Sequence, residues 1–307
     1  EGSYGDKEVT LKERERDLAR NPDNRVYKLQ AAALSTDLRR WDDARKRIED
    51  IRKTEDGLDI AIIAATWSAD QSDLETAEKT LHDYAVKVKE GKDGNDRSGE
   101  ALMALARFMV PRGRPDRAVV ALEEARPYQD PKRLQADRML AELYLEMAET
   151  DKAIETLRTI ANASKDTPDD TVRLRLAEAL IQVRRFDEAE KELQLLTKEG
   201  REGPVAMLLR ADAAMGKGDS KQAMEILDKA VTAFSSNAGV FLKRAQASIE
   251  MKRNVADILA DLDQVLKLDP RLWQAHQLRA VIFQSQGKKN DVVNEIKAIL
   301  LIDPTQD

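Results

Sequence analysis

The amino-acid sequence predicts an all-α fold of the solenoid class, in which short helical hairpins stack one after another. Alanines recur at an interval of about 34 residues, aliphatic side chains recur in phase with them, and the composition favours helices. The recurring alanines are Ala32, Ala65, Ala106, Ala141, Ala177, Ala211, Ala245 and Ala280. A small side chain needed once per repeat indicates that two helices approach closely at the same place in every unit.

Two further rows of side chains follow the alanines and define the second helix of each unit. The first row is small or branched and lies about twelve residues after the alanine: Ala44, Ala77, Ala118, Ala153, Ala189, Ala223, Ile258 and Val292. The second row is aliphatic and comes one helical turn later: Ile48, Leu81, Leu122, Leu157, Leu193, Leu227, Leu262 and Ile296. Residues four apart share one helix face, so both rows belong to one helix. Each unit is therefore predicted to be a helix A, a short turn and a helix B.

Glycine and proline mark the turns. Gly113, Gly218 and Gly287 occupy the same position after the repeat alanine, where a helix C-terminus needs a left-handed backbone. Pro111 and Pro115 flank Gly113, so we expect helix A of that unit to end early and helix B to start cleanly. The composition agrees with this assignment, because 35% of the residues are charged and only 4% are aromatic.

The recurring residues divide the chain into eight units. Their predicted ranges are 25–57, 58–98, 99–133, 134–169, 170–203, 204–237, 238–272 and 273–306. The longest interval indicates an insertion at residues 87–99, which we interpret as a surface loop. An acidic calcium loop is the alternative, but Arg97 and Ala104 stand where ligands are required.

Both ends of the sequence look unfinished. Residues 1–24 are expected to hold a cloning remnant, Glu1-Gly2-Ser3, and an N-terminal helix or half repeat, so the sequence is interpreted as a fragment of a larger protein. At the other end, helix 288–302 is rich in aliphatic residues and no polar capping helix follows. An uncapped apolar face calls for further repeats, a partner or self-association through this helix. A tolerated apolar terminus is the alternative.

The small residue, glycine, alanine, aliphatic residue and terminal proline at these offsets resemble the tetratricopeptide repeat over about residues 25–306. Two units end in Leu268-Asp269-Pro270 and Ile302-Asp303-Pro304. The resemblance implies a right-handed superhelical solenoid of about eight repeats, with helix A lining a concave groove and helix B outside. It implies that a protein or peptide segment binds in the groove. The large aromatic residue of the family near the start of helix A is mostly missing here.

Composition excludes several functional classes. A net charge of −6 argues against a nucleic-acid partner, and no run of about 18 apolar residues indicates membrane insertion of this segment. The chain has no cysteine, and its two histidines, His82 and His276, lack metal-ligand spacing. We therefore expect a non-enzymatic protein with no catalytic residue, cofactor or metal. Cytoplasmic and periplasmic locations both stay open.

Helix A supplies the candidate binding residues. Counting the repeat alanine as position eight, groove contacts of the resembled family come from positions two, five, nine, twelve and thirteen. The candidates at these positions are Arg107, Arg138, Glu142, Glu146, Glu178, Asp212 and Gln246. Their mostly acidic character favours a basic or amide-rich partner. The alternative is an ordinary solvated helix surface, in which Arg138 and Glu142 compensate one another.

A row of arginines is a second candidate site. Arg210, Arg244 and Arg279 occupy position seven of the last three units. Position seven lies about 200° around the helix from position nine, so the two rows face different sides. The arginines either pair with local carboxylates beside helix B or form an anion site for a carboxylate or phosphate.

The sequence thus favours a protein-interaction scaffold that binds a partner segment in its groove. The alternative is a structural repeat region of an envelope polysaccharide-export or secretion assembly, which a signal peptide in the full-length gene would support.

Overall fold

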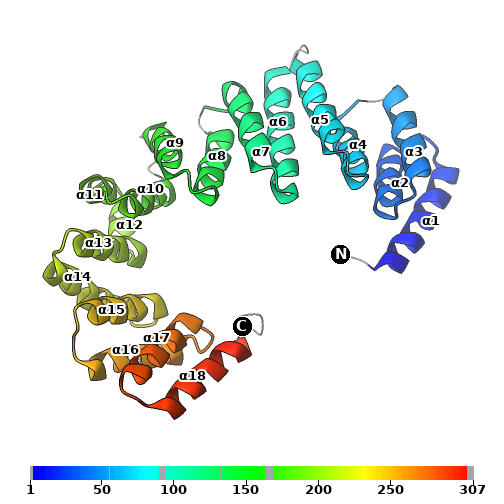
Figure 1. Cartoon of the computed structure of the whole chain (residues 1–307). Coiled ribbons are helices and arrows are strands. Elements are labelled where there is room, and N and C mark those ends of the chain that lie inside the picture. The colour runs from blue at the N-terminus through cyan, green and yellow to red at the C-terminus, as the bar shows by residue number, and fades with distance from the viewer. Residues whose placement is uncertain (1–2, 55, 90–93, 132, 164–168, 303–307) are drawn as a thin grey trace. The chain divides into compact units, whose positions relative to one another are not determined.

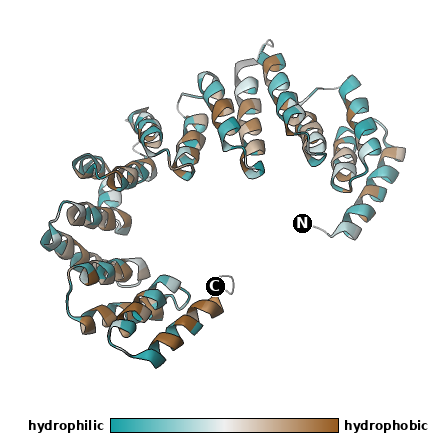
Figure 2. Ribbon diagram, in the orientation of Figure 1, coloured by the Kyte–Doolittle hydropathy of each residue, from teal (hydrophilic) through white to brown (hydrophobic). Residues whose placement is uncertain are grey.

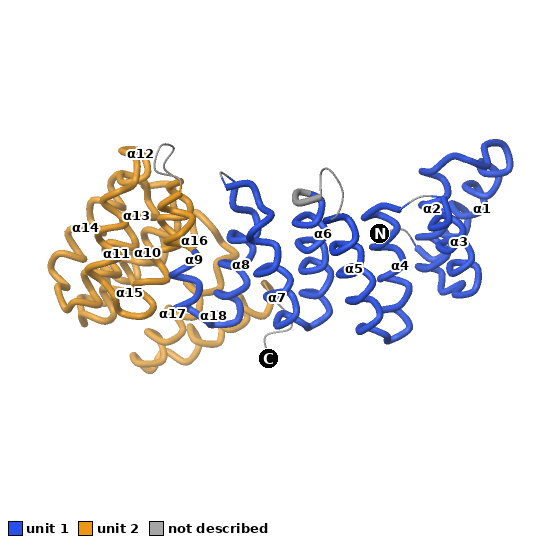
Figure 3. The backbone as a smooth tube through the Cα atoms, turned by 90° about the horizontal axis from the view of Figure 1, so that it is seen from above, with its two compact units in different colours: residues 1–156 blue, residues 157–307 orange. Residues whose placement is uncertain are grey.

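The structure, a computed structural model, describes residues 3–54, 56–89, 94–131, 133–163 and 169–302. These ranges contain 18 α-helices and two 3-10 helices (Figure 1). The chain groups into two compact units, residues 1–156 and 157–307, and the boundary falls inside α9 (Figure 3). Glu1 and Gly2 of the expected cloning remnant lie outside the described residues.

Consecutive helices pair as eight hairpins in the described part of the chain, which confirms the all-α class and the predicted number of about eight repeats. Helices A are α2 (Arg25–Asp37), α4 (Leu58–Asp70), α6 (Gly94–Met109), α8 (Gln135–Glu146), α10 (Asp170–Gln182), α13 (Pro204–Gly216), α15 (Ala238–Glu250) and α17 (Trp273–Ser285). Helices B are α3 (Trp41–Thr54), α5 (Leu74–Lys89), α7 (Pro115–Ala125), α9 (Thr150–Ala163), α11 (Phe186–Gln194), α14 (Ser220–Ala233), α16 (Val255–Leu268) and α18 (Lys289–Ile302). The helices follow the predicted ranges except that α6 begins at Gly94, before the predicted boundary at residue 99.

One helix precedes the hairpins. Helix α1 (Tyr4–Arg20) begins with a capping box, in which the side chains of Ser3 and Asp6 bond each other's backbone N–H groups. Its Leu11 is fully buried and packs with Leu38 against α2. Helix α1 therefore occupies the segment in which an N-terminal helix or half repeat is expected.

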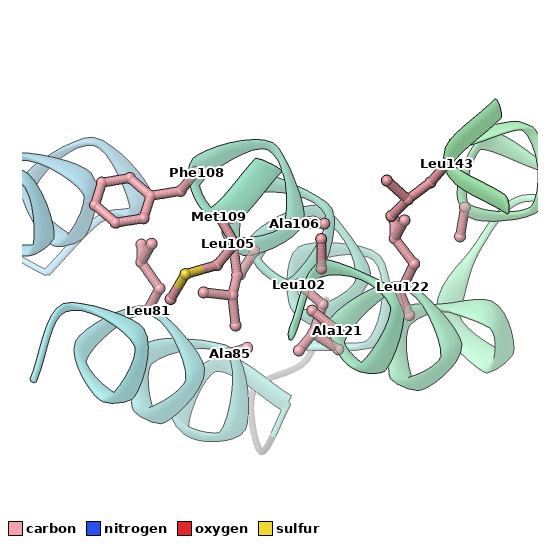
Figure 4. Packing of buried hydrophobic residues seen from close by; sticks show 14 of the residues in the cluster. Leu81, Ala85, Leu102, Leu105, Ala106, Phe108, Met109, Ala121, Leu122 and Leu143 are labelled. Atoms are coloured by element: carbon pink, nitrogen blue, oxygen red, sulfur yellow. The ribbon is translucent and has the colours of Figure 1, made fainter. Parts of the chain in front are cut away.

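The repeat alanines lie in the core, as their spacing predicts. Seven of them are at most 1% exposed, and only Ala280 of the last hairpin is half-buried. Figure 4 shows part of the core of the first compact unit, where Leu105 and Met109 of α6 lie beside Leu81 of α5. Because a side chain larger than alanine would push these helices apart, the small residue recurs in each repeat.

The turn between helices A and B has the same backbone conformation in all eight hairpins. A residue with positive φ stands seven positions after each repeat alanine: Arg39, Ser72, Gly113, Ala148, Arg184, Gly218, Lys252 and Gly287. Glycine adopts this conformation without strain, whereas the other residue types carry a cost of about 1–2 kcal/mol. The three glycines thus identify a turn that five non-glycine residues also form.

Pro111 and Pro115 act as expected around Gly113. Helix α6 ends at Met109, the 3-10 helix η1 (Val110–Arg112) follows, and Pro115 is the first residue of α7.

The structure corrects the expected loop at residues 87–99. Residues 87–89 end α5 and residues 94–99 begin α6, so both helices are extended, and residues 90–93 lie outside the description. The Arg97 guanidinium donates to the Tyr84 hydroxyl at 3.1 Å and links the extension of α6 to α5. Gly99 packs so closely on Tyr128 that an added Cβ would stand 3.0 Å from the Tyr128 Cβ. Close helix packing therefore orders much of the inserted segment as helix.

Two short helices were not predicted. The 3-10 helix η2 (Arg126–Tyr128) follows α7, and α12 (Lys198–Glu202) lies between α11 and α13. The Thr197 side chain caps α12 by accepting a hydrogen bond from the Gly200 N–H at 3.1 Å.

Candidate functional site

A depression of about 360 Å³ lies in the first compact unit (residues 1–156), between two successive helices A, α6 and α8. Its lining residues come from α6, η1, α7 and α8: Ala106, Val110, Leu122, Arg138, Met139, Glu142, Leu143 and Glu146. Five of these eight residues are apolar. The three charged ones, Arg138, Glu142 and Glu146, were all predicted as partner-groove residues.

The helical period of α8 explains how these side chains come together. Arg138, Glu142 and Glu146 are four residues apart and lie along one face of the helix. Met139 and Leu143 form a neighbouring row, again four residues apart, which turns toward the core. Glu142 and Glu146 are exposed, whereas Leu143 is buried, so α8 presents an acidic edge beside an apolar strip.

The floor of the depression comes from the repeat core. Ala106 and Leu122 are buried, and Figure 4 shows the Leu122 side chain of α7 directed toward Leu143 of α8. Val110, 37% exposed, forms the other wall. Because Ala106 has a small side chain, it leaves space above Leu122 that an apolar side chain of a partner can fill.

Helix α8 is anchored to the preceding repeat by a buried tyrosine. The Tyr144 hydroxyl donates to Glu123 Oε1 at 3.0 Å. Burial, followed by the hydrogen bond to Glu123, raises the pKa of Tyr144 to about 12. Arg126 Nε lies 2.9 Å from the buried Asp137 carboxylate, and hydrogen bonding to Glu123 raises the Arg126 pKa. These contacts hold the charged edge of the depression in place.

The depression suits binding of a peptide segment. Its floor accepts an apolar side chain, and the carboxylates of Glu142 and Glu146 can receive hydrogen bonds from a lysine, arginine or amide. The Arg138 Nε–H donates to the Arg133 carbonyl at 3.1 Å. Both Arg138 and Glu142 have further interactions within the chain, so a partner would rearrange an existing polar surface.

The other predicted groove residues lie outside the depression. Arg107 is exposed on α6 but does not line it. Glu178, Asp212 and Gln246 belong to the second unit, on the successively packed helices α10, α13 and α15. The seven predicted residues therefore form two sets, one in each compact unit.

Carboxylates of the second set already have basic neighbours. Lys243 Nζ lies 2.9 Å from both carboxylate oxygens of Asp212 and joins α15 to α13. Glu178 lies 3.4 Å from Arg175 on the same helix. The acidic character of this set is thus partly neutralised within the chain.

The arginine row agrees with the local-pairing alternative. Arg244 makes hydrogen bonds of 2.9 and 2.6 Å to Asp261, and Arg279 lies 2.7 Å from Asp263. Arg210 donates to the carbonyls of Arg201 and Leu193, at 3.0 and 3.1 Å. Hydrogen bonding to Asp261 raises the pKa of Arg244. Carboxylate and carbonyl oxygens thus occupy the positions that a bound anion would need.

The sequence pattern missed the apolar residues of the depression. Val110 stands at position twelve, one of the groove positions of the resembled family, so that register could have identified it. Met139 stands at position six, outside those positions, and its role follows only from the packing of α6, α7 and α8.

Both histidines pair with glutamates. His82 Nε2 lies 2.9 Å from Glu124 Oε2, and His276 Nδ1 lies 2.6 Å from Glu295 Oε2. Within the described part of the chain, no group of three or more histidine, cysteine or acidic side chains is placed to hold a metal ion. None of the described helices is both long and apolar enough to span a membrane.

The helical hairpins and their recurring alanines define a repeat solenoid. Family models of the tetratricopeptide repeat match residues 112–169 and 174–238, so this part of the chain carries tetratricopeptide repeats. Proteins of this family generally serve as protein-interaction scaffolds and bind protein or peptide partners.

Two solved structures support the fold. A tetratricopeptide-repeat protein from Parabacteroides merdae is 18% identical, with a TM-score of 0.59; the match covers 81% of this chain and 94% of that one. PilW, a widely conserved type IV pilus biogenesis factor, is 16% identical, with a TM-score of 0.53; the match covers 68% and 95% of the two chains. A comparison with curated proteins finds no match. At these identities the likeness concerns the fold alone.

Proposed function

We propose that this chain is a non-enzymatic scaffold that holds a segment of a partner protein in the depression between α6 and α8. The observation that carries the proposal is the combination of an apolar floor with two exposed carboxylates at one edge. An apolar side chain of the partner fills the floor beside Met139, and a basic or amide side chain reaches Glu142 and Glu146. Arg107 is a further candidate in the first compact unit, and Glu178, Asp212 and Gln246 form a separate candidate set in the second.

Selection of a displayed random-peptide library on the immobilised chain tests the proposal. We expect selected peptides to combine apolar residues with lysine or arginine. Their binding should weaken as salt rises from about 0.05 to 0.5 M, because exposed charge pairs are screened. Glu142→Lys with Glu146→Lys should abolish binding, whereas Glu13→Lys, on the exposed surface of α1, should leave it unchanged. Peptides that bind the double variant equally well contradict the proposal.

The alternative function, a structural repeat region of an envelope export or secretion assembly, stays a prediction. The likeness to PilW concerns the fold and does not select between the two functions. A signal peptide in the full-length gene and recovery of the protein with envelope fractions would favour it.

A further inference from the structure

Helix α18, in the second compact unit, carries an exposed apolar row. Val293 is 49% exposed, Ile296 46% and Leu300 38%. These residues stand at i, i+3 and i+7, so they lie on one face of the helix. Figure 2 shows hydrophobic residues along much of α18. Apolar residues at this spacing form the kind of row against which an amphipathic helix packs its apolar face.

The preceding helix B shows what kind of element covers such a row. Helix α18 repeats α16 at a shift of 34 residues, so that Leu259, Leu262 and Leu266 correspond to Val293, Ile296 and Leu300. Leu262 is fully buried in α16, whereas Ile296 is open. The cluster around Leu262 includes Ala275, Leu278 and Ile282 of α17, which also stand at i, i+3 and i+7. An α17-like helix therefore covers this surface on α16.

A buried carboxylate fixes the same orientation for both helices B. In α16, Asp261 pairs with Arg244, and the next residue, Leu262, packs under α17. In α18, Glu295 is buried, with Arg279 Nε at 3.0 Å and His276 Nδ1 at 2.6 Å. Because Glu295 faces α17, Ile296 faces outward as the counterpart of Leu262.

A charge beside the row specifies the partner further. Asp228 and Asp263 each directly follow the buried leucine of their helix B, and each receives an arginine of the next helix A. Arg244 lies 2.9 Å from Asp228, and Arg279 lies 2.7 Å from Asp263. The corresponding residue of α18 is the exposed Lys297. The charge at this position of α18 is thus opposite in sign to Asp228 and Asp263.

We propose that α18 binds an amphipathic helix of a partner protein, with apolar residues at i, i+3 and i+7 and a glutamate or aspartate at i+4. The apolar residues take the places of Ala275, Leu278 and Ile282, and the acid takes the place of Arg279 and meets Lys297. A second copy of α18 fits less well. Its own i+4 residue is Lys297, so self-association would bring two lysines together.

Two synthetic peptides with the sequence of α17, residues 273–285, test the proposal. Both carry a hydrocarbon staple at the exposed positions of Gln277 and Val281, and one carries Arg279→Glu. Fluorescence anisotropy should show that the Glu peptide binds the chain about three- to fivefold more tightly than the Arg peptide. The chain variant Lys297→Glu should reverse this preference.

Two variants, a folding control and a measurement of the oligomeric state complete the test. Ile296→Asp should weaken the Glu peptide about tenfold or more, whereas Val205→Asp, at an exposed valine of α13, should not. Circular dichroism confirms that both variants stay folded. Equal affinity for the two peptides, or no binding of either at about 1 mM, overturns the proposal. Sedimentation should show a monomer, and a dimer that Ile296→Asp dissociates would identify a second copy as the occupant and overturn it as well.

Discussion

Arg244 of α15 holds the carboxylate of Asp261 of α16 with two hydrogen bonds, of 2.9 and 2.6 Å, and also contacts Asp228 of α14 at 2.9 Å. Asp261 is only 7% exposed. One guanidinium therefore ties a hairpin together and joins it to the preceding repeat. Such a buried pair adds little net stability over an apolar pair of the same shape, but losing one partner is costly.

Arg244→Met should lower the free energy of unfolding by about 3–5 kcal/mol, because Asp261 is left buried without its partner. The measurement is urea unfolding followed by circular dichroism. The double variant Arg244→Met with Asp261→Leu should recover most of the loss. Arg45→Met is the matched control, since the Arg45–Glu49 pair is exposed and its loss should change stability little. Equal losses for Arg244→Met and Arg45→Met would contradict the role given to Asp261.

The repeat alanines should tolerate larger side chains only where no further helix packs on them. Ala177→Leu, at a fully buried position, is expected to cost about 1–3 kcal/mol through overpacking. Ala280→Leu, at the same repeat position but half-buried, should cost markedly less. Thermal unfolding of the two variants measures the difference, and similar melting temperatures would refute the close approach inferred at Ala177.

The left-handed turn position allows a reciprocal exchange. Gly218 has φ of 83°, and an added Cβ would meet nothing within 4 Å, so Gly218→Ala should cost about 1 kcal/mol through backbone strain alone. Ala148 has φ of 57°, and Ala148→Gly should stabilise the protein by about 0.5–1 kcal/mol. Denaturant midpoints test both changes. A loss of stability in Ala148→Gly would show that the turn conformation is not the controlling factor.

Tyr144 should make the protein sensitive to base. Its pKa of about 12 lies above the ordinary value of 10, so the folded state favours the neutral phenol. The contribution of Tyr144 to the free energy of unfolding is fully present below pH 10. It declines by about 3 kcal/mol in total as pH rises toward 12, because Tyr144 of the unfolded state ionises first. Unfolding midpoints measured from pH 8 to 12 should fall less in Tyr144→Phe than in the native chain. Parallel curves would contradict the raised pKa.

Much of the fold follows from the positions of small and aliphatic residues. The register of Ala32 to Ala280 predicts all eight hairpins, because close helix packing imposes a steric requirement that is visible in the sequence. It also identifies the turn position at Ala148 and Arg184, where residue type alone would not predict a left-handed backbone. The insertion at 87–99 was misassigned because its glycines and acids resemble a loop, whereas packing on Tyr84 and Tyr128 orders much of it as helix.

The candidate site was only partly predictable. Spacing places Arg138, Glu142 and Glu146 on one face of α8, since that depends on helix geometry alone. The apolar floor joins Val110, Leu122 and Met139 from three elements, and its shape depends on how neighbouring repeats are offset. The bond from Lys243 to Asp212 depends on the same offset, so the partial neutralisation of the acidic row could not be read from spacing.

The most direct test of the proposed binding surface maps where a partner segment lies. A peptide selected on the native chain is given a photoreactive benzophenone at its apolar anchor, and the cross-linked residues are identified by mass spectrometry. The account predicts cross-links at Val110, Met139 and neighbouring residues of α6 and α8, with loss of cross-linking in the Glu142→Lys, Glu146→Lys variant. Cross-links concentrated instead on helices B, for example at the exposed Val86 or Val120, would contradict it.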